Sequence, residues 1–95
     1  MHDELLPVVT TRYVTQRSFP IVYVSVEDDG DGGKLIQFHC AVEDYSPEVL
    51  QLVALREILE IDSSVSEVLA MPVGCAAQRS AVGAPWSVSP LVAED

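Results

Sequence analysis

The sequence predicts an α+β fold, a small antiparallel β-sheet with two short consecutive helices packed on one face. Two observations lead to this class. Extended stretches of β-branched and apolar residues are separated by turn residues, and between positions 55 and 69 the apolar spacing becomes helical. A chain of 95 residues forms one domain, 1–95, whose ordered core we expect at about 8–90 with frayed ends.

The N-terminal part predicts three strands. Val8 to Thr15 mixes β-branched with polar residues, which is typical of a half-exposed strand. Pro20 to Glu27 has little polar content on either face, which predicts a central strand that begins at the proline. Lys34 to Cys40 is the third strand. Residues 28–33, rich in aspartate and glycine, predict a tight turn before it, so the second and third strands form a β-hairpin.

The middle of the chain predicts a short strand and two helices. Val49 to Ala54 fits a strand or a helix equally well, and we expect the strand. Two short helices follow with a break at Asp62. Ser64 and Glu67 have the spacing of a capping box for the second helix, which ends before Pro72.

The C-terminal part predicts two further strands. They cover Val73 to Ser80 and Trp86 to Ser89, with a turn at residues 81–85 between them. A terminal strand leaves one edge of a sheet free, and such an edge can pair with a second copy. The sequence is therefore compatible with a monomer or an edge-paired homodimer.

The charge of the chain excludes several kinds of partner. Fifteen acidic residues against five basic ones give a formal net charge of −10, which repels phosphate backbones and anionic lipid heads, so we expect no nucleic acid and no membrane partner. The first apolar run has no basic flank and is interrupted by Pro7, unlike a signal peptide. We expect a cytoplasmic protein that meets a basic protein partner.

The sequence predicts no metal site and no cofactor. The loop 27–33 clusters carboxylates as calcium loops do, but the twelfth position counted from Asp28 is His39 in place of a bidentate glutamate. His39 and Cys40 are neighbours in a predicted strand, so their side chains point to opposite faces and cannot chelate one ion. The other nitrogen and sulfur ligands of the chain are His2 and Cys75.

No catalytic residue is predicted either. Cys40 as a nucleophile would need a base that lowers its pKa, whereas the acidic chain favours the neutral thiol. We expect Cys40 and Cys75 to be reduced thiols, as is usual in a cytoplasmic protein. With fifteen acids on a small surface, carboxylate pairs arise by chance and do not indicate an acid/base site.

The candidate partner-binding residues are acidic, with one aromatic exception. Carboxylates gather in the hairpin turn and before Pro47, where they form a negative surface. Tryptophan is a residue type that anchors interfaces, although packing in the core or at the sheet edge is the favoured interpretation here. The candidates are Asp28, Asp29, Asp31, Glu43, Asp44 and Trp86.

Several segments together resemble a family of small bacterial proteins. The segments are Tyr23 to Gly32, Ile36 to Cys40, Ile58 to Leu69, Pro72 to Arg79 and Gly83 to Trp86. The family has no known function and is grouped with predicted immunity proteins of polymorphic toxin systems. The similarity covers nearly the whole chain, with departures at Ile36, Cys75 and Ala77, where the family carries aromatic residues. The resemblance implies a binding role without catalysis and identifies no functional residue.

Two functional hypotheses follow. The first is a cytoplasmic protein-binding domain of the immunity type, which neutralises a toxin by occupying it and whose acidic surface speeds association with a basic partner. The alternative is a small hydrolase or small-molecule-binding domain that uses carboxylates beside Cys40. A pocket that holds a group with a perturbed pKa would favour the alternative.

Overall fold

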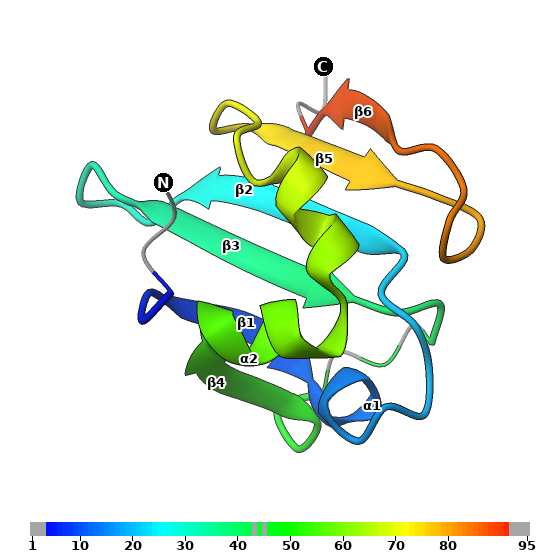
Figure 1. The fold of residues 1–95 in the computed structure, drawn as a ribbon. Coiled ribbons are helices and arrows are strands. Elements are labelled where there is room, and N and C mark those ends of the chain that lie inside the picture. Colours follow the sequence, from blue (N-terminus) through cyan, green and yellow to red (C-terminus); the bar gives the residue numbers. More distant parts are fainter. Residues whose placement is uncertain (1–3, 43, 45, 92–95) are drawn as a thin grey trace.

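Figure 1 shows the fold in a computed structural model that describes residues 4–42, 44 and 46–91. The described residues form one sheet of six strands with the spatial order β4-β1-β3-β2-β5-β6. The strands are β1 (Pro7–Thr11), β2 (Tyr23–Asp28), β3 (Lys34–His39), β4 (Leu50–Ala54), β5 (Cys75–Gln78) and β6 (Ser87–Pro90). The helical segments are α1 (Arg12–Thr15), α2 (Leu55–Ile61) and the 3₁₀-helix η1 (Ser63–Val68).

The sheet is mixed, so the prediction of an antiparallel sheet is wrong at one pair of strands. β1 and β3 run parallel, with Val9 opposite Gln37, and the other neighbouring strands are antiparallel. The chain passes from β1 through α1 into β2, which lies two places away from β1. β3 returns antiparallel to β2 in the hairpin and lies between β1 and β2. It therefore runs in the same direction as β1.

The predicted strand Val8 to Thr15 is too long. β1 ends at Thr11, and the next four residues form the single turn α1. The amide of Arg12 donates to the carbonyl oxygen of Val49 over 2.9 Å, and the turn brings Val14 into the core, where its exposure is 0%. Burial of this valine outweighs the local preference of β-branched residues for a strand.

The predicted central strand and hairpin are confirmed. β2 pairs with β3 on one side and β5 on the other, and Val26 lies opposite Ile36 in the hairpin. The paired strand begins at Tyr23, three residues later than predicted. In the turn, Gly30 and Gly32 have φ angles of 93° and 82°, in the left-handed region that glycine adopts without steric cost.

The segment 49–54 is a strand, as expected. It forms β4 and pairs with β1 at one edge of the sheet. The predicted strands 73–80 and 86–89 are present as β5 and β6, which are shorter or shifted by one residue. β6 forms the opposite edge of the sheet.

The helical region breaks at Asp62, but its second part is a 3₁₀-helix and its cap differs from the predicted one. Asp62 has extended backbone angles and is the N-cap of η1. Its carboxylate accepts hydrogen bonds from the amide and the hydroxyl of Ser64, over 3.0 and 2.6 Å. The predicted capping box with Ser64 as the cap is therefore wrong, because the aspartate two residues earlier satisfies the free amide.

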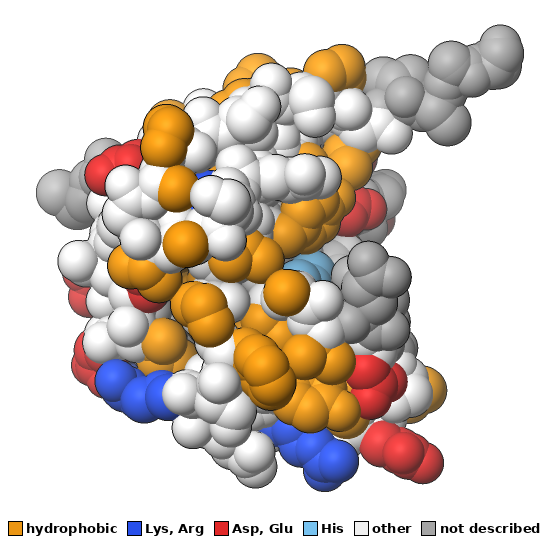
Figure 2. Space-filling model, turned by 90° about the vertical axis from the view of Figure 1, so that its right-hand side faces the viewer, with side chains coloured by type: hydrophobic (Ala, Val, Ile, Leu, Met, Phe, Trp, Pro, Cys, Tyr) orange, Lys and Arg blue, Asp and Glu red, His pale blue; other side chains and the backbone are white. Residues whose placement is uncertain are grey.

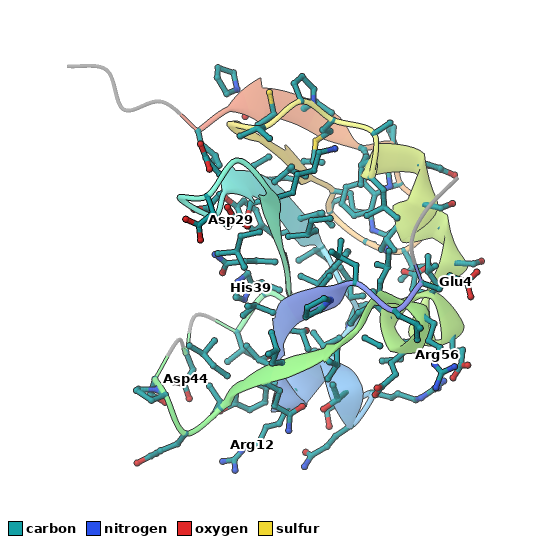
Figure 3. All side chains as sticks on the ribbon, turned by 90° about the vertical axis from the view of Figure 1, so that its left-hand side faces the viewer. Glu4, Arg12, Asp29, His39, Asp44 and Arg56 are labelled. Atoms are coloured by element: carbon teal, nitrogen blue, oxygen red, sulfur yellow. The ribbon has the colours of Figure 1, made fainter. Side chains whose placement is uncertain are left out.

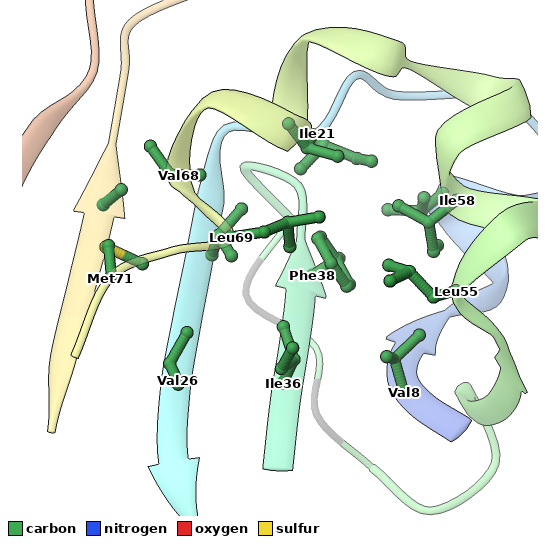
Figure 4. Packing of buried hydrophobic residues seen from close by; sticks show 14 of the residues in the cluster. Val8, Ile21, Val26, Ile36, Phe38, Leu55, Ile58, Val68, Leu69 and Met71 are labelled. Carbon is green, nitrogen blue, oxygen red and sulfur yellow. The ribbon is translucent and has the colours of Figure 1, made fainter. Parts of the chain in front are cut away.

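The core lies between the sheet and the segment that contains α2 and η1. Figure 4 shows Phe38 of β3 at its centre, with Leu55 and Ile58 of α2 on one side and Leu69 on the other. Burial of each such side chain stabilises the fold by about 1.5–3 kcal/mol. The remaining buried members are Val8, Val14, Ile21, Val24, Val26, Ile36, Cys40, Val65, Val68, Met71 and Ala77.

The two faces of the sheet differ in what covers them. In Figure 1, α2 and η1 lie in front of the sheet, and no described helix lies behind it. We call the rear the open face. Side chains alternate along a strand, so the residues of β2 and β3 that do not enter the core lie on the open face. None of the described helices is long and apolar enough to cross a membrane.

Candidate functional site

The open face contains a cleft of about 630 Å³, a volume typical of ligand-binding sites. Figure 2, which looks at the molecule from the right-hand side of Figure 1, shows hydrophobic side chains beside a hollow at the edge of this face. Polar side chains from neighbouring strands also line the cleft, because the pairing of β2 with β3 sets Ser25 opposite Gln37 and Tyr23 opposite His39. The lining residues are Val22, Tyr23, Ser25, Glu27, Gln37, His39, Cys40, Ala41, Leu50, Gln78 and Arg79.

Four of these side chains form a continuous hydrogen-bonded chain. Ser25 Oγ and Gln37 Nε2 each donate to Glu27 Oε2 over 3.1 Å. Gln37 Oε1 lies 3.0 Å from His39 Nε2. Because an amide oxygen only accepts, this orientation of the glutamine places the proton of the neutral imidazole on Nε2. The glutamine thus connects the imidazole to the carboxylate without a direct contact between them.

Burial and a nearby charge act in opposite directions on His39. The imidazole is 5% exposed, and this burial lowers its pKa below the usual 6.5, while the negative charge of Glu27 raises it by a smaller amount. The lower pKa keeps His39 neutral at pH 7. The cleft therefore holds a neutral imidazole beside a carboxylate.

Glu27 has hydrogen-bonding capacity to spare. Both of its side-chain hydrogen bonds use Oε2, and among the described residues nothing donates to Oε1. Lys34 lies opposite Asp28 in the hairpin, one position away from Glu27, and so on the other side of the strand. Within the described part of the chain, no basic side chain reaches into the cleft to neutralise this carboxylate.

Arg79 borders the cleft, but its guanidinium group lies on the covered face. Nε and Nη2 donate to the carbonyl oxygen of Ile21 over 3.0 and 2.8 Å, and Nη1 donates to Ser64 Oγ over 2.8 Å. Nη2 also forms an ion pair with Asp62. The guanidinium carbon stacks 4.2 Å from the ring centroid of Trp86. These contacts join β5 to η1 and to the segment before β2, so Arg79 has a structural role.

The pKa of Asp62 reflects its burial and its contacts with Ser64 and Arg79. Burial acts to raise it, but the hydrogen bonds from the Ser64 hydroxyl, from Arg79 and from the Ser64 amide outweigh burial and hold the pKa below the usual 3.8. The cluster is thus a charged pair with its hydrogen bonds satisfied, which is the condition under which a buried pair is tolerated.

The candidate aspartates of the hairpin lie at its exposed tip. Asp28 Oδ1 accepts from the amide of Gly30 over 2.8 Å, and Asp29 Oδ1 accepts from the amides of Asp31 and Gly33 over 2.7 and 3.0 Å. These bonds hold the turn. Among the described residues, no group of three or more His, Cys, Asp or Glu side chains is arranged to hold a metal ion.

Asp44 lies beyond the other end of β3 and is held by its own contacts. It accepts hydrogen bonds from the hydroxyls of Tyr13 and Ser46, over 2.8 and 2.9 Å, and from the Ser46 amide over 3.2 Å. These bonds, first that of Tyr13, lower its pKa. Glu43, the other candidate in this loop, is outside the described residues.

The predicted candidates do not converge on one point. Asp29 and Asp44 lie near opposite ends of β3, and Figure 3 shows His39 between them. Trp86 is half-buried, packs against the core and covers Arg79, in line with the packing interpretation. Among the described residues its indole nitrogen has no hydrogen-bond partner.

Sequence reasoning missed the residues that line the cleft. It placed Gln37 and His39 on the face away from the core, but used this only to exclude a metal site. The signal was the hairpin register: a turn that joins Asp28 to Lys34 also sets Ser25 opposite Gln37. Pairing the two strands residue by residue would have brought these side chains together.

The chain matches no family model, no curated protein and no solved structure. The resemblance to immunity proteins of polymorphic toxin systems therefore stays a prediction. Function has to be inferred from the charge and geometry of the cleft and of the surfaces beside it.

Proposed function

We propose that the protein is a cytoplasmic protein-binding domain that takes a basic partner on the open face of its sheet. One observation carries the proposal: no described helix covers this face, and its cleft holds the Glu27 carboxylate with no described basic side chain to balance it. The family resemblance supports the immunity type, in which the domain neutralises a toxin by occupying it.

Exposed leucines beside the cleft support a protein partner. Leu50 and Leu52 of β4 lie opposite Thr11 and Val9 of β1, and they are 38% and 70% exposed. Apolar side chains next to a polar cleft combine the two kinds of contact that protein interfaces use. A small polar ligand would leave these leucines in water.

The charge distribution supports a basic partner. The net charge is −10, and Asp28, Asp29 and Asp31 are exposed at the tip of the hairpin that carries the cleft. Such a field accelerates the encounter with a basic protein, and its effect decreases with salt because the screening length is about 8 Å at physiological ionic strength. Fast association suits an inhibitor that must bind before damage occurs.

The experiment is capture of partners from the source organism at low and moderate salt, with charge variants of the two faces. D28N/D29N/D31N removes three charges at the hairpin and keeps the oxygens that hold the turn. E57Q/E60Q/E67Q removes three exposed charges on the helical side, so both variants change the net charge equally. We expect a basic protein whose recovery decreases with salt and with the hairpin variant alone. Equal loss in both variants, or no specific partner, contradicts the proposal.

The free protein is proposed to be a monomer. β4 is an edge strand without a charged residue, so an edge-paired homodimer through β4 is the alternative. Pairing would bring together two chains that each carry a charge of −10, which opposes association. Analytical ultracentrifugation at low and high salt distinguishes the monomer from the dimer. If the β4 edge pairs, high salt should increase the dimer fraction, because it screens the repulsion between the two chains.

A small-molecule-binding domain or small hydrolase with an acidic site remains the second candidate, since the cleft is large enough for a ligand. The geometry favours binding over hydrolysis. Gln37 separates His39 from Glu27, and Cys40 belongs to the core cluster. A thermal-shift screen of metabolites favours this candidate if one compound stabilises the wild type and not a cleft variant.

A further inference from the structure

The cleft has the features of a receptor for a positive group. Glu27 is half-buried, and Ser25 and Gln37 hold one of its oxygens in place. These donors are neutral, so they orient the carboxylate without compensating its charge. A partly desolvated carboxylate gains most from a cation that also donates hydrogen bonds.

His39 is a further uncharged side chain in the hydrogen-bonded chain that holds the Glu27 carboxylate. It is connected to Glu27 through Gln37 and is itself neutral at pH 7, since burial disfavours its charged form. Ser25 and His39 are 2% and 5% exposed, so the floor of the cleft is built from side chains with fixed positions. Such a floor is pre-organised for a ligand.

The walls of the cleft suit an aliphatic stem. Val22, Ala41 and Leu50 are apolar lining residues, and Tyr23 adds an aromatic ring. Lysine and arginine lay their methylene stems along apolar surface while the charged end reaches a polar group. An aromatic ring near that end attracts a cation.

We propose that the cleft is a receptor for one cationic side chain, a lysine or arginine of the bound partner, with the Glu27 carboxylate as its counter-ion. This inference rests on the proposed function and specifies its central contact. The carboxylate accepts the ammonium or guanidinium protons at Oε1, and the stem lies along the cleft.

Other occupants fit the cleft less well. An anionic group would meet the carboxylate of Glu27 without a cation to hold it. A metal ion needs several oxygen, nitrogen or sulfur ligands, and the described residues contain no such cluster. A guanidinium or ammonium group needs one carboxylate and nearby acceptors.

The test uses Nα-acetyl-arginine amide as a probe and the citrulline analogue, which is uncharged and nearly the same shape, as its control. Binding is followed by NMR at low salt, through the side-chain amide of Gln37 and the ring protons of His39. We expect saturable shifts in the millimolar range with the arginine probe and none with citrulline. Equal shifts with both probes, or no saturable shift, overturn the inference.

Two protein variants locate the contact. E27Q removes the charge and retains an oxygen that can accept from Ser25 and Gln37, whereas D31N removes one charge at the hairpin tip. We expect E27Q to lower the affinity for the arginine probe about tenfold or more, and D31N to lower it less than about twofold. Unchanged amide shifts distant from the cleft show that each variant is folded. Retained affinity in E27Q overturns the assignment.

Partner capture separates failure of this inference from failure of the proposed function. If wild type and E27Q capture the basic partner equally while the hairpin variant loses it, the protein binds its partner without the cleft, and the inference fails alone. If the probe binds but no basic protein is captured, the ligand is a free organic cation. That result overturns both the proposed function and the assignment of the cleft to a partner side chain.

Discussion

Two groups of buried polar side chains lie on opposite faces of this sheet, and they differ in how completely they are satisfied. On the covered face, all three nitrogens of Arg79 have partners, from Ile21, Ser64 and Asp62. On the open face, Glu27 accepts two hydrogen bonds on one oxygen. The Arg79 group, whose three nitrogens all have hydrogen-bond partners, joins separate elements of the fold. Glu27 has an oxygen that can still accept a hydrogen bond from a ligand.

The difference follows from the access of water. An unpaired polar group under α2 and η1 would cost about 1–3 kcal/mol, because no solvent could replace its partner. The open face has no such penalty, since water can occupy the free positions in the cleft until a partner displaces it. A polar cluster with all its hydrogen bonds made therefore indicates a structural role, whereas an accessible polar group with a free acceptor indicates a binding site.

The largest effect is expected from removing the centre of the covered group. R79M leaves Asp62 without its counter-ion and the Ile21 carbonyl without its donors, so we expect a loss of about 3–5 kcal/mol in the free energy of unfolding. Urea unfolding at neutral pH measures it, with R56M, an exposed arginine of α2, as the control that changes by less than about 0.5 kcal/mol. A loss below about 1 kcal/mol in R79M would remove the contrast between the two groups.

A second comparison uses two aliphatic side chains of similar size. Ile58 is 0% exposed under the covered face and Leu52 is 70% exposed on the open one. We expect I58A to cost about 2–5 kcal/mol and L52A to stay within about 0.5 kcal/mol. L52A should nevertheless weaken partner capture. Normal capture by L52A would show that the leucines of β4 lie outside the interface.

The acid side of the stability profile tests Asp62. Its pKa is lower in the folded protein than the usual 3.8, so the unfolded chain binds the proton more tightly. The stabilisation is therefore complete above about pH 4 and is lost as pH falls below 3.8 toward the folded pKa. D62N should lose about 1–3 kcal/mol at neutral pH and have a flatter acid profile than the wild type. An unchanged profile would contradict the contacts of Asp62 with Ser64 and Arg79.

The smallest effect concerns coupling within the cleft. Burial places the pKa of His39 below 6.5, so stability decreases as pH falls from 6.5 toward the folded pKa. Because the charge of Glu27 raises this pKa, E27Q should lower the NMR titration midpoint of His39 further, and D31N should change it less. No response of the midpoint to E27Q would show that the two groups are not coupled, and a midpoint at or above 6.5 would show that burial does not dominate the pKa of His39.

The parts of the fold that the sequence predicts are local. The hairpin could be predicted because aspartate and glycine at 28–33 determine a turn between two alternating strands, and the break at Asp62 because apolar spacing changes there. The parallel pairing of β1 and β3 could not, since β3 enters between strands that are distant in sequence. The end of β1 was missed because the burial of Val14 depends on the complete core.

The candidate site divides in the same way. The acidic residues of the hairpin turn can be read directly from the sequence, and their exposure could be predicted because charged side chains favour water. The cleft depends on register, because Glu27, Gln37 and His39 come together only when the two strands are paired residue by residue. Composition also gave no indication that Arg79 would become the centre of the covered group, since its partners come from two segments that are distant from it in sequence.

The most direct test of the central claim is NMR shift mapping with the captured basic partner. Binding on the open face predicts that resonances of Gln37, His39 and Leu52 change on addition of the partner, while those of Glu57 and Glu67 on the helical side do not. E27Q should reduce these changes at equal partner concentration. Changes concentrated on α2 and η1, with the cleft unaffected, would contradict the account.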